Sequence, residues 1–266
     1  MEIISLLALG VVAGILAGLL GVGGGIVIVP VLVWIFSHGN DVPALHLMHI
    51  AIGTSLTTIV FTSLSSIRAH HQHGAIQWDL FKRLTPSIIV GAFMGALVAD
   101  MIPSHGLHLF FSCFLLLAAI QMGIGKQPVP SQQLPKGFKL GIAGFLIGKI
   151  SSLVGIGGGS LVVPYLSWSN IPMRQAVATS AATGFPIAIS SMLGFIIMGW
   201  DAEQLPAWST GYVYWAAVIA IVPTSLLCAP LGAKLAHTVP VKILKRFFAV
   251  FLIFVGLKML SMALTS

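Results

Sequence analysis

Apolar residues in this chain run in long, nearly continuous stretches that short polar segments separate. Several long stretches carry no Asp, Glu, Lys or Arg, among them residues 3–40, 42–67, 101–125, 175–200 and 204–233. Each is longer than the roughly 20 residues that a helix needs to cross a bilayer. Because the apolar residues are continuous and do not alternate, they indicate spanning helices and not the strands of a barrel. The pattern predicts an all-α polytopic membrane protein.

The order of apolar segments repeats once along the chain. A long segment at 3–37 is followed by expected helices near 44–68, 80–99 and 105–124, and a segment at 138–169 by helices near 172–199, 211–235 and 240–262. Matching residues recur in order: Gly21, Pro30 and Trp34 as Gly155, Pro164 and Trp168, and Thr54, Ser55 and Gly74 as Thr179, Ser180 and Gly199. We expect a duplication within a single membrane domain, with a first repeat at 1–125, a connector at 126–137 and a second repeat at 138–266.

A glycine run interrupts the first segment of each repeat. The two runs are Gly21-Val22-Gly23-Gly24-Gly25 and Gly155-Ile156-Gly157-Gly158-Gly159. Each glycine weakens a helix by about 1 kcal/mol relative to alanine, so an ordinary helix does not continue through four of them. We therefore expect the helix to stop at each run and a second, shorter helix to start there, at membrane depth.

Charge predicts that the two repeats are inverted. The loop after the second block carries Arg68, Lys82 and Arg83 in the first half, but Asp201 and Glu203 in the second. The next loop is the reverse, with Asp100 in the first half and Lys234, Lys242, Lys245 and Arg246 in the second. Basic loops favour the cytoplasmic side, so equivalent loops lie on opposite sides of the membrane.

Inverted repeats constrain the two broken segments. Only one net crossing fits between the basic connector and the acidic loop at Asp201, and the helix at 172–199 supplies it. The segments 3–37 and 138–169 are then re-entrant helical hairpins with the glycines at their tips. We expect six full crossings, two hairpins and both termini outside. Eight full crossings are the alternative, which would make the repeats parallel.

Composition excludes several classes of protein. With 57% hydrophobic and 7% charged residues and a mean hydropathy of +1.03, the chain has too few charges to cover a soluble globule. The net charge of +7 resides mostly in loops, where it sets membrane orientation, so nucleic acid is not an expected partner. Cys113 and Cys228 lie inside apolar helices and indicate no disulfide. Residues 1–20 carry Glu2 and no basic residue, and they are read as part of the mature fold and not as a signal peptide.

The glycine runs are the strongest candidate for a binding site. The first N–H groups of a helix lack partners within the helix and carry the positive end of its dipole, so they favour an anion. Two such starts that enter from opposite faces would meet near the midplane, where the expected substrate-binding residues are Gly23, Gly24, Gly25, Gly157, Gly158, Gly159 and the capping hydroxyl of Ser160. The alternative is that the glycines only allow tight helix packing.

Hydroxyls and two cations add to this candidate site. The pairs Thr54-Ser55 and Thr179-Ser180 begin hydroxyl stripes that either line a pathway or pack between helices: Ser55, Thr58, Thr62 and Ser66, then Ser180, Thr183 and Ser191. Lys149 lies about 15 Å deeper than Lys139, by helix rise, and is either a substrate ligand or a snorkelling side chain. Arg68 either clamps an oxyanion at the cytoplasmic mouth or anchors the helix by its charge.

The remaining polar residues argue against a metal site or a proton relay of carboxylates. His70, His71 and His73 occupy an expected loop that offers no carboxylate or thiolate partner, so we expect no metal and no cofactor. All six carboxylates lie at expected helix ends or in loops. His46 and His49 start the hydroxyl-rich helix, where they either titrate or pack.

Several of these motifs together resemble one family. The paired G-x-G-G-G runs, each followed by Pro30 or Pro164, the Thr-Ser pairs and the stretch Gly74-Ala75-Ile76-Gln77-Trp78 are similar to those of the TauE/SafE exporters. The resemblance implies a secondary transporter in the bacterial inner membrane that exports a sulfur oxyanion, either sulfite or an organosulfonate such as sulfoacetate. A passive anion channel and a His-rich membrane metal-binding protein remain the alternatives. The expected partners are a small anion, the lipid bilayer and a second copy in a homodimer.

Overall fold

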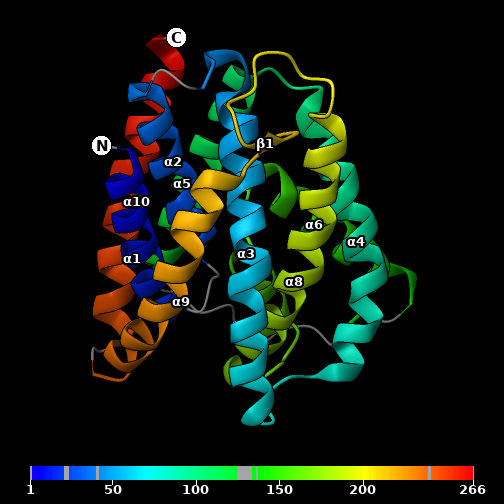
Figure 1. Ribbon diagram of the computed structural model, residues 1–266. Coiled ribbons are helices and arrows are strands. Elements are labelled where there is room, and N and C mark those ends of the chain that lie inside the picture. Colours follow the sequence, from blue (N-terminus) through cyan, green and yellow to red (C-terminus); the bar gives the residue numbers. More distant parts are fainter. Residues whose placement is uncertain are drawn as a thin grey trace.

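The chain folds into a bundle of α-helices, shown by a computed structural model (Figure 1). The structure describes residues 2–20, 24–39, 42–124, 134–135, 137–238 and 241–265. Its helices are α1 (Glu2–Leu20), α2 (Gly25–His38), η1 (Ala44–His46), α3 (Leu47–Gln72), α4 (Trp78–Asp100), α5 (Ser104–Ile124), α6 (Phe138–Val154), α7 (Gly159–Trp168), α8 (Met173–Met198), α9 (Trp215–Thr238) and α10 (Val241–Thr265). Two short strands, β1 (Ser209–Thr210) and β2 (Val213–Tyr214), form an antiparallel pair.

The observed elements match the expected ones closely. Both apolar segments with glycine runs divide into two helices, α1 and α2 in the first and α6 and α7 in the second. By length and composition, four helices within the described ranges can cross a membrane, namely α3 with η1, α4, α5 and α8. Shorter apolar stretches occur in α1, α2, α9 and α10. The chain is therefore a helical multi-pass membrane protein, whereas most of the connector and Gly21–Gly23 lie outside the described residues.

Helices α3 and α8 pack against each other in opposite directions at the centre of the bundle. Thr54, early in α3, accepts a hydrogen bond from the N–H of Tyr214, directly before α9 (3.1 Å). Thr179, early in α8, accepts one from the N–H of Gln77, directly before α4 (3.0 Å). Since Gln77 follows the end of α3, the start of α8 lies beside the end of α3, and the two helices are antiparallel.

Helix α6 runs alongside α4 in the same direction. Gly144 of α6 packs against Leu84 early in α4, and Gly95 late in α4 packs against Ser152 near the end of α6. Small residues at these positions let the two backbones approach closely. After the turn, four residues separate the end of α7 from the start of α8. The start of α8 lies beside the start of α4. Helices α6 and α7 therefore begin and end at the same end of the bundle.

Helix α1 packs against α9, and α2 packs against α3. Gly10 and Gly14 of α1 pack in parallel register against Ile221 and Ser225 of α9. Helix α9 begins beside Thr54, near the start of α3, and α2 is followed by η1 and α3 after a short segment. Helices α1 and α2 consequently start and finish at the end of the bundle where α3 begins, as their positions in Figure 1 show.

Charged side chains separate between the two ends of the bundle. Among the side chains that the structure describes, the end where α4, α6 and α8 start, the basic end, carries exposed Arg68, Lys82, Arg83, Lys139, Arg174 and Arg246, together with Asp79. The other, the acidic end, carries exposed Asp100, Asp201 and Glu203, together with Lys258, whose Nζ lies 5.9 Å from the centre of the Trp34 ring. Exposed tryptophans lie near both ends, as at the two interfaces of a bilayer: Trp34, Trp200 and Trp208 at the acidic end, and Trp78 and Trp168 at the basic end.

The segment before α9 differs from the expected helix at 211–235. Residues 209–214 form the β1–β2 pair, because Gly211 takes a φ of +54° that favours a tight turn over a helix. Gly74, before α4, has a similar φ of +61°, and in both halves a helix beginning with tryptophan follows. The structural counterpart of Gly74 is therefore Gly211, whereas Gly199, its counterpart in the sequence comparison, has a φ of −86°.

Candidate functional site

Both glycine runs start a helix in the interior of the bundle. Gly24 precedes α2 with a φ of +73°, and Gly158 precedes α7. Their carbonyls accept the first hydrogen bonds of the new helices, at 3.0 and 3.1 Å for Gly24 and at 3.2 and 2.7 Å for Gly158. Gly24, Gly25 and Gly157 to Gly159 are all buried. The N–H groups of each first turn therefore face protein and not bulk water.

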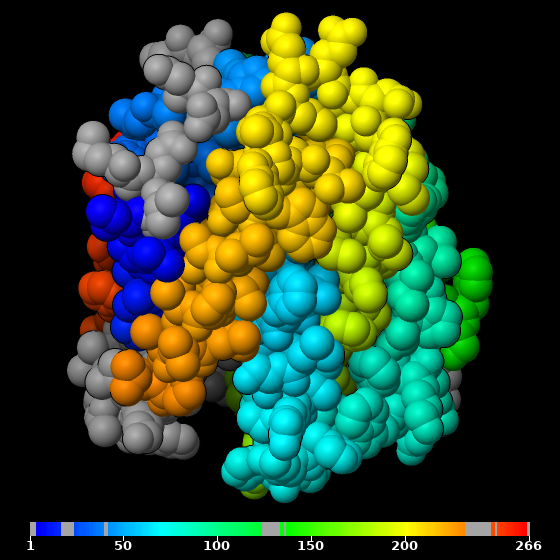
Figure 2. Space-filling view, viewed as in Figure 1, coloured from blue at the N-terminus to red at the C-terminus, as the bar shows by residue number. Residues whose placement is uncertain are grey.

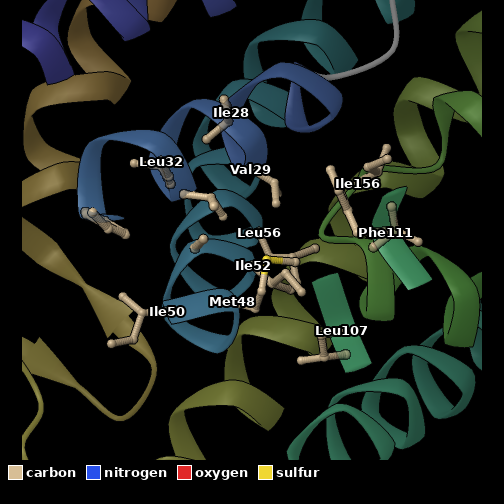
Figure 3. Close-up of a cluster of buried hydrophobic side chains, with 14 of the residues drawn as sticks. Ile28, Val29, Leu32, Met48, Ile50, Ile52, Leu56, Leu107, Phe111 and Ile156 are labelled. Atoms are coloured by element: carbon tan, nitrogen blue, oxygen red, sulfur yellow. The ribbon is translucent and has the colours of Figure 1, made fainter. Parts of the chain in front are cut away.

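The two glycine turns touch each other. A Cβ added at Gly25 would lie 2.6 Å from the carbonyl oxygen of Gly155 and 3.1 Å from the Cα of Ile156. Gly155 ends α6 with a φ of +72° and packs against Val29 and Ile52. Figure 3 shows Ile156 beside Val29 of α2. The start of α2 and the turn after α6 thus share one buried junction, while Gly23 lies outside the described residues.

Ser55 connects this junction to α3. Its hydroxyl is fully buried and donates a hydrogen bond to the carbonyl oxygen of Gly155 (2.9 Å). That carbonyl belongs to the electronegative end of α6, and it also lies against Gly25 at the electropositive start of α2. The start of α2 therefore already faces a protein dipole of the favourable sign.

The start of α7 has different surroundings. Gly158 packs against the hydroxyl of Thr183 and the carbonyl of Ser180, at 2.9 and 3.2 Å from an added Cβ. Thr183 donates its hydroxyl hydrogen to the Ser180 carbonyl within α8 (2.9 Å). Gly184 of α8 faces the backbone nitrogen of Gly158. A Cβ added at Gly184 would lie 3.7 Å from that nitrogen. Helix α8 therefore forms one wall beside the first turn of α7.

Four serine hydroxyls around the second turn have no hydrogen-bond partner among the described residues. They belong to the last turn of α6, the first turn of α7 and the facing part of α8: Ser151, Ser152, Ser160 and Ser180. A buried hydroxyl that makes no hydrogen bond costs roughly 1–3 kcal/mol, so such groups seldom collect without a partner. Each can donate to an anion, as can the N–H groups of the first turn of α7. Polar groups that could bind an anion are thus concentrated at the second glycine turn.

Ser151 and Ser152 were not candidates in the sequence. Their signal is modest, since two serines in the last turn before a glycine run also fit simple helix packing. The fold brings them to the turn because α6 ends at Gly155, whose N–H bonds back to the carbonyl of Ser152 (3.2 Å).

Thr54 and Thr179 lie close to the candidate site, but their hydroxyls bond elsewhere. Each accepts the backbone hydrogen bond described above, from Tyr214 and from Gln77. In each case the donor directly precedes the first residue of a helix of the other half. The structure therefore makes these threonines attachment points for α9 and α4, while the adjacent Ser55 and Ser180 lie at the second glycine turn.

The two cations lie at different depths. Lys149 is half-buried in α6, and its backbone packs against Gly95, about one and a half helical turns before Gly155. Arg68 is exposed near the end of α3, at the basic end. Only Lys149 therefore lies near the level of the glycine turns.

The histidines after Arg68 belong mainly to a helix and not to a loop. Helix α3 continues to Gln72, so that His70 and His71 lie in its last turn. His71 contacts the ring of Trp78, and Nδ1 of His73 lies 2.8 Å from the carbonyl of Ala69. No cluster of three or more metal-ligating side chains occurs in the part of the chain that the structure describes.

Comparison with known proteins agrees with this architecture. The model of the family "Sulfite exporter TauE/SafE" matches residues 6–259. The chain belongs to the TauE/SafE family. The match covers both glycine turns and all of the hydroxyl-rich helices, so the family resemblance expected from the motifs is confirmed.

Relatives of this TauE/SafE chain are named as transporters. A probable membrane transporter protein of Haemophilus influenzae is 40% identical over 255 residues, which are 95% of this chain and 96% of the relative. A similarly named protein of Methanocaldococcus jannaschii is 30% identical over 96% of this chain and 94% of its own length. Another, of Bacillus subtilis, is 29% identical over 98% of both chains. No solved structure matches the chain. Family and relatives together identify a membrane transporter.

Proposed function

We propose that this TauE/SafE protein is a secondary transporter that exports a small sulfur oxyanion, either sulfite or an organosulfonate such as sulfoacetate. The observation that carries the proposal is the set of four buried serine hydroxyls without partners around the start of α7. Sulfite and sulfonates present several oxygen acceptors, which hydroxyls and helix N–H groups can bind together. The matching family model is named for sulfite export.

The anion binds between the first turn of α7 and the facing part of α8. Gly157, Gly158 and Gly159 bring the backbone N–H groups close to the ligand, and the hydroxyls of Ser160 and Ser180 complete its coordination. Lys149, half-buried in α6, compensates the negative charge. Gly24, Gly25 and Ser55 position the turn from the other side through Gly155. Arg68 collects anions at the basic end.

The two halves of the chain act as inverted repeats with two re-entrant hairpins. The antiparallel directions of α3 and α8 support this topology, as does the packing of α1 along α9 and of α6 along α4. The repeats comprise residues 1–125 and 138–266. Alternating access then arises from relative movement of the repeats around the central turns.

The basic end faces the cytoplasm and the acidic end the opposite side, with the protein in the inner membrane of a bacterium. Exposed Arg and Lys side chains at the basic end support this orientation, because such residues are enriched in cytoplasmic loops. Both termini then lie outside, because the start of α1 and the end of α10 lie toward the acidic end of the bundle in Figure 1.

Direct binding to the purified protein tests the proposal. Sulfite and sulfoacetate should bind, and acetate should bind more weakly because it offers fewer acceptor oxygens. In proteoliposomes, external sulfite should accelerate the exit of labelled internal sulfite, since exchange across alternating states distinguishes a transporter from a passive channel. Absence of binding by every sulfur oxyanion would refute the proposed substrate class.

A matched pair of variants in α8 tests the location of the site. Ser180→Ala should weaken sulfite binding about tenfold, equivalent to about 1.4 kcal/mol. Ser191→Ala removes an equally buried hydroxyl that also lacks a partner among described residues, but eleven positions further along α8, about 16 Å away. It should leave sulfite affinity unchanged. Equal effects of the two substitutions would contradict a site at the start of α7.

A further inference from the structure

A second group of polar side chains lies at the acidic end, away from the anion site. His49, in the first turn of α3, is only 4% exposed. Its ring centre lies 5.0 Å from that of Tyr212 in the β1–β2 turn and 6.3 Å from that of His46. The Tyr212 hydroxyl donates a hydrogen bond to the carboxylate of Asp100 at the end of α4 (3.0 Å). In Figure 2 the segment that contains this turn, in yellow, covers the upper part of α3.

The hydrogen bond between His49 and Ala99 indicates which ring nitrogen carries hydrogen in this conformation. Nε2 lies 3.1 Å from the carbonyl oxygen of Ala99, and since a carbonyl only accepts, Nε2 carries the hydrogen. Nδ1 is buried and has no partner among the described residues. A second proton at Nδ1 would place a charged imidazolium, only 4% exposed, inside the bundle, which is strongly unfavourable. The closed arrangement therefore selects the neutral imidazole.

Once the β1–β2 turn moves away from His49, the groups that surround the imidazole favour its protonation. Asp100 is exposed and negatively charged at the end of α4, and burial and Asp100 together raise the pKa of Tyr212, so that its hydroxyl remains a donor. Other titratable groups on the neighbouring elements are the histidines His46 before α3, His38 at the end of α2, and His105 and His108 on α5, together with Tyr214 of β2 and with Asp201 and Glu203 between α8 and β1. The described part of α5 carries no Asp, Glu, Lys or Arg, and α8 contributes the Phe195 ring beside Tyr212. Asp100 is therefore the charge that would stabilise a protonated His49.

We propose that His49 is a proton-binding residue whose protonation opens the acidic end and promotes binding of the transported anion. Its linkage to the anion rests on the proposed function. Six residues separate His49 from Ser55 on α3, a rise of about 9 Å, so a positive imidazole attracts an anion at the central turn. Linkage is reciprocal, and a bound anion therefore favours the protonated imidazole equally.

Hydrogen exchange without any anion tests the proton site by itself. Backbone amides of Tyr212, Val213 and Tyr214 should lose protection about tenfold or more between about pH 8 and pH 5.5, after correction for intrinsic exchange. His49→Gln, which keeps an N–H for the Ala99 carbonyl, should abolish this pH response. His108→Gln changes another buried histidine and should retain it. Unchanged protection in the wild type, or a wild-type response in His49→Gln, would overturn the proposal.

Calorimetry with methanesulfonate tests the linkage. This probe keeps one negative charge throughout the pH range, so protons taken up on binding come from the protein and not from the ligand. Titration near neutral pH in buffers of different ionisation enthalpy should show net proton uptake in the wild type and in His108→Gln, and none in His49→Gln. Binding without proton uptake in the wild type would refute the linkage. If neither methanesulfonate nor sulfite binds at any pH, the proposed function fails, and hydrogen exchange alone then decides the proton site.

Discussion

The hydroxyl of Ser55 donates a hydrogen bond to the carbonyl oxygen of Gly155, which lies 100 residues further along the chain. This bond links the central helix of the first half to the glycine turn of the second. The same carbonyl lies against Gly25 at the start of α2. Three segments from both halves thus converge on one backbone oxygen, and the turn that holds the candidate site depends on that convergence.

Removing the Ser55 hydroxyl should destabilise the protein and impair transport. Ser55→Ala leaves the buried Gly155 carbonyl without its side-chain donor, at a cost of about 1–3 kcal/mol. Ser63→Ala is the matched control, because the Ser63 hydroxyl is also buried in α3 but bonds to Val60 of its own helix (3.0 Å). Thermal unfolding in detergent and sulfite exchange in proteoliposomes measure the two effects. Equal losses in both variants would contradict a special role for the Ser55 bond.

Gly155 should tolerate alanine less well than another glycine of the same backbone conformation. Both Gly155 and Gly74 have positive φ, which costs an alanine about 1–2 kcal/mol. Only at Gly155 does the added Cβ meet neighbours, with Val29 at 2.8 Å and Ile52 at 3.2 Å, whereas nothing lies within 4 Å at Gly74. Gly155→Ala should therefore lower the melting temperature more than Gly74→Ala. Similar melting temperatures of the two variants would contradict the close packing of Gly155 against Val29 and Ile52.

Hydrophobic patterning predicted the elements well, because each helix is long and apolar and the glycine runs interrupt helices locally. The expected segments at 3–37 and 138–169 divide at Gly24 and Gly158, as the glycines required. Patterning could not predict which hydroxyl of each Thr-Ser pair points to the turn. Thr54 and Thr179 bond to backbone amides more than 100 residues away, and a pairing over that separation leaves no periodic pattern in the sequence.

The sequence also did not predict that the two glycine turns have different surroundings. The two runs read almost alike, yet the start of α2 faces the Gly155 carbonyl while the start of α7 is surrounded by serine hydroxyls. That difference depends on how the two glycine turns pack against each other, which is a tertiary property. Similarly, His49, Asp100 and Tyr212 come together only in the folded chain. The start of α3, the end of α4 and the β1–β2 turn lie at one end of the bundle.

The hydrogen bonds that Thr54 and Thr179 accept from Tyr214 and Gln77 should be lost independently of each other. Thr54→Val and Thr179→Val keep the side-chain shape but remove the acceptor for one backbone N–H each. Thr54→Val should speed hydrogen exchange at Tyr214 and leave Gln77 unchanged, and Thr179→Val should do the reverse. Thr57→Val serves as the control, since the Thr57 hydroxyl donates its hydrogen bond to the carbonyl of Gly53 in its own helix (2.8 Å). A change at both amides in either variant would indicate general unfolding and not the loss of one attachment.

Removing the charge of Lys149 is the most direct test of whether the bound substrate is negatively charged. If the half-buried ammonium compensates the anion, Lys149→Met should raise the Kd for sulfite about tenfold or more, because a buried opposite charge stabilises the ligand more than a solvated one. Lys149→Arg keeps the charge and should retain most of the affinity, and Lys139→Met removes an exposed lysine from the start of the same helix and should change little. Wild-type affinity and exchange rate in Lys149→Met would exclude Lys149 as a substrate ligand. The side chain would then serve only to anchor α6 in the membrane, and the serine hydroxyls and helix N–H groups would bind the anion without a cation.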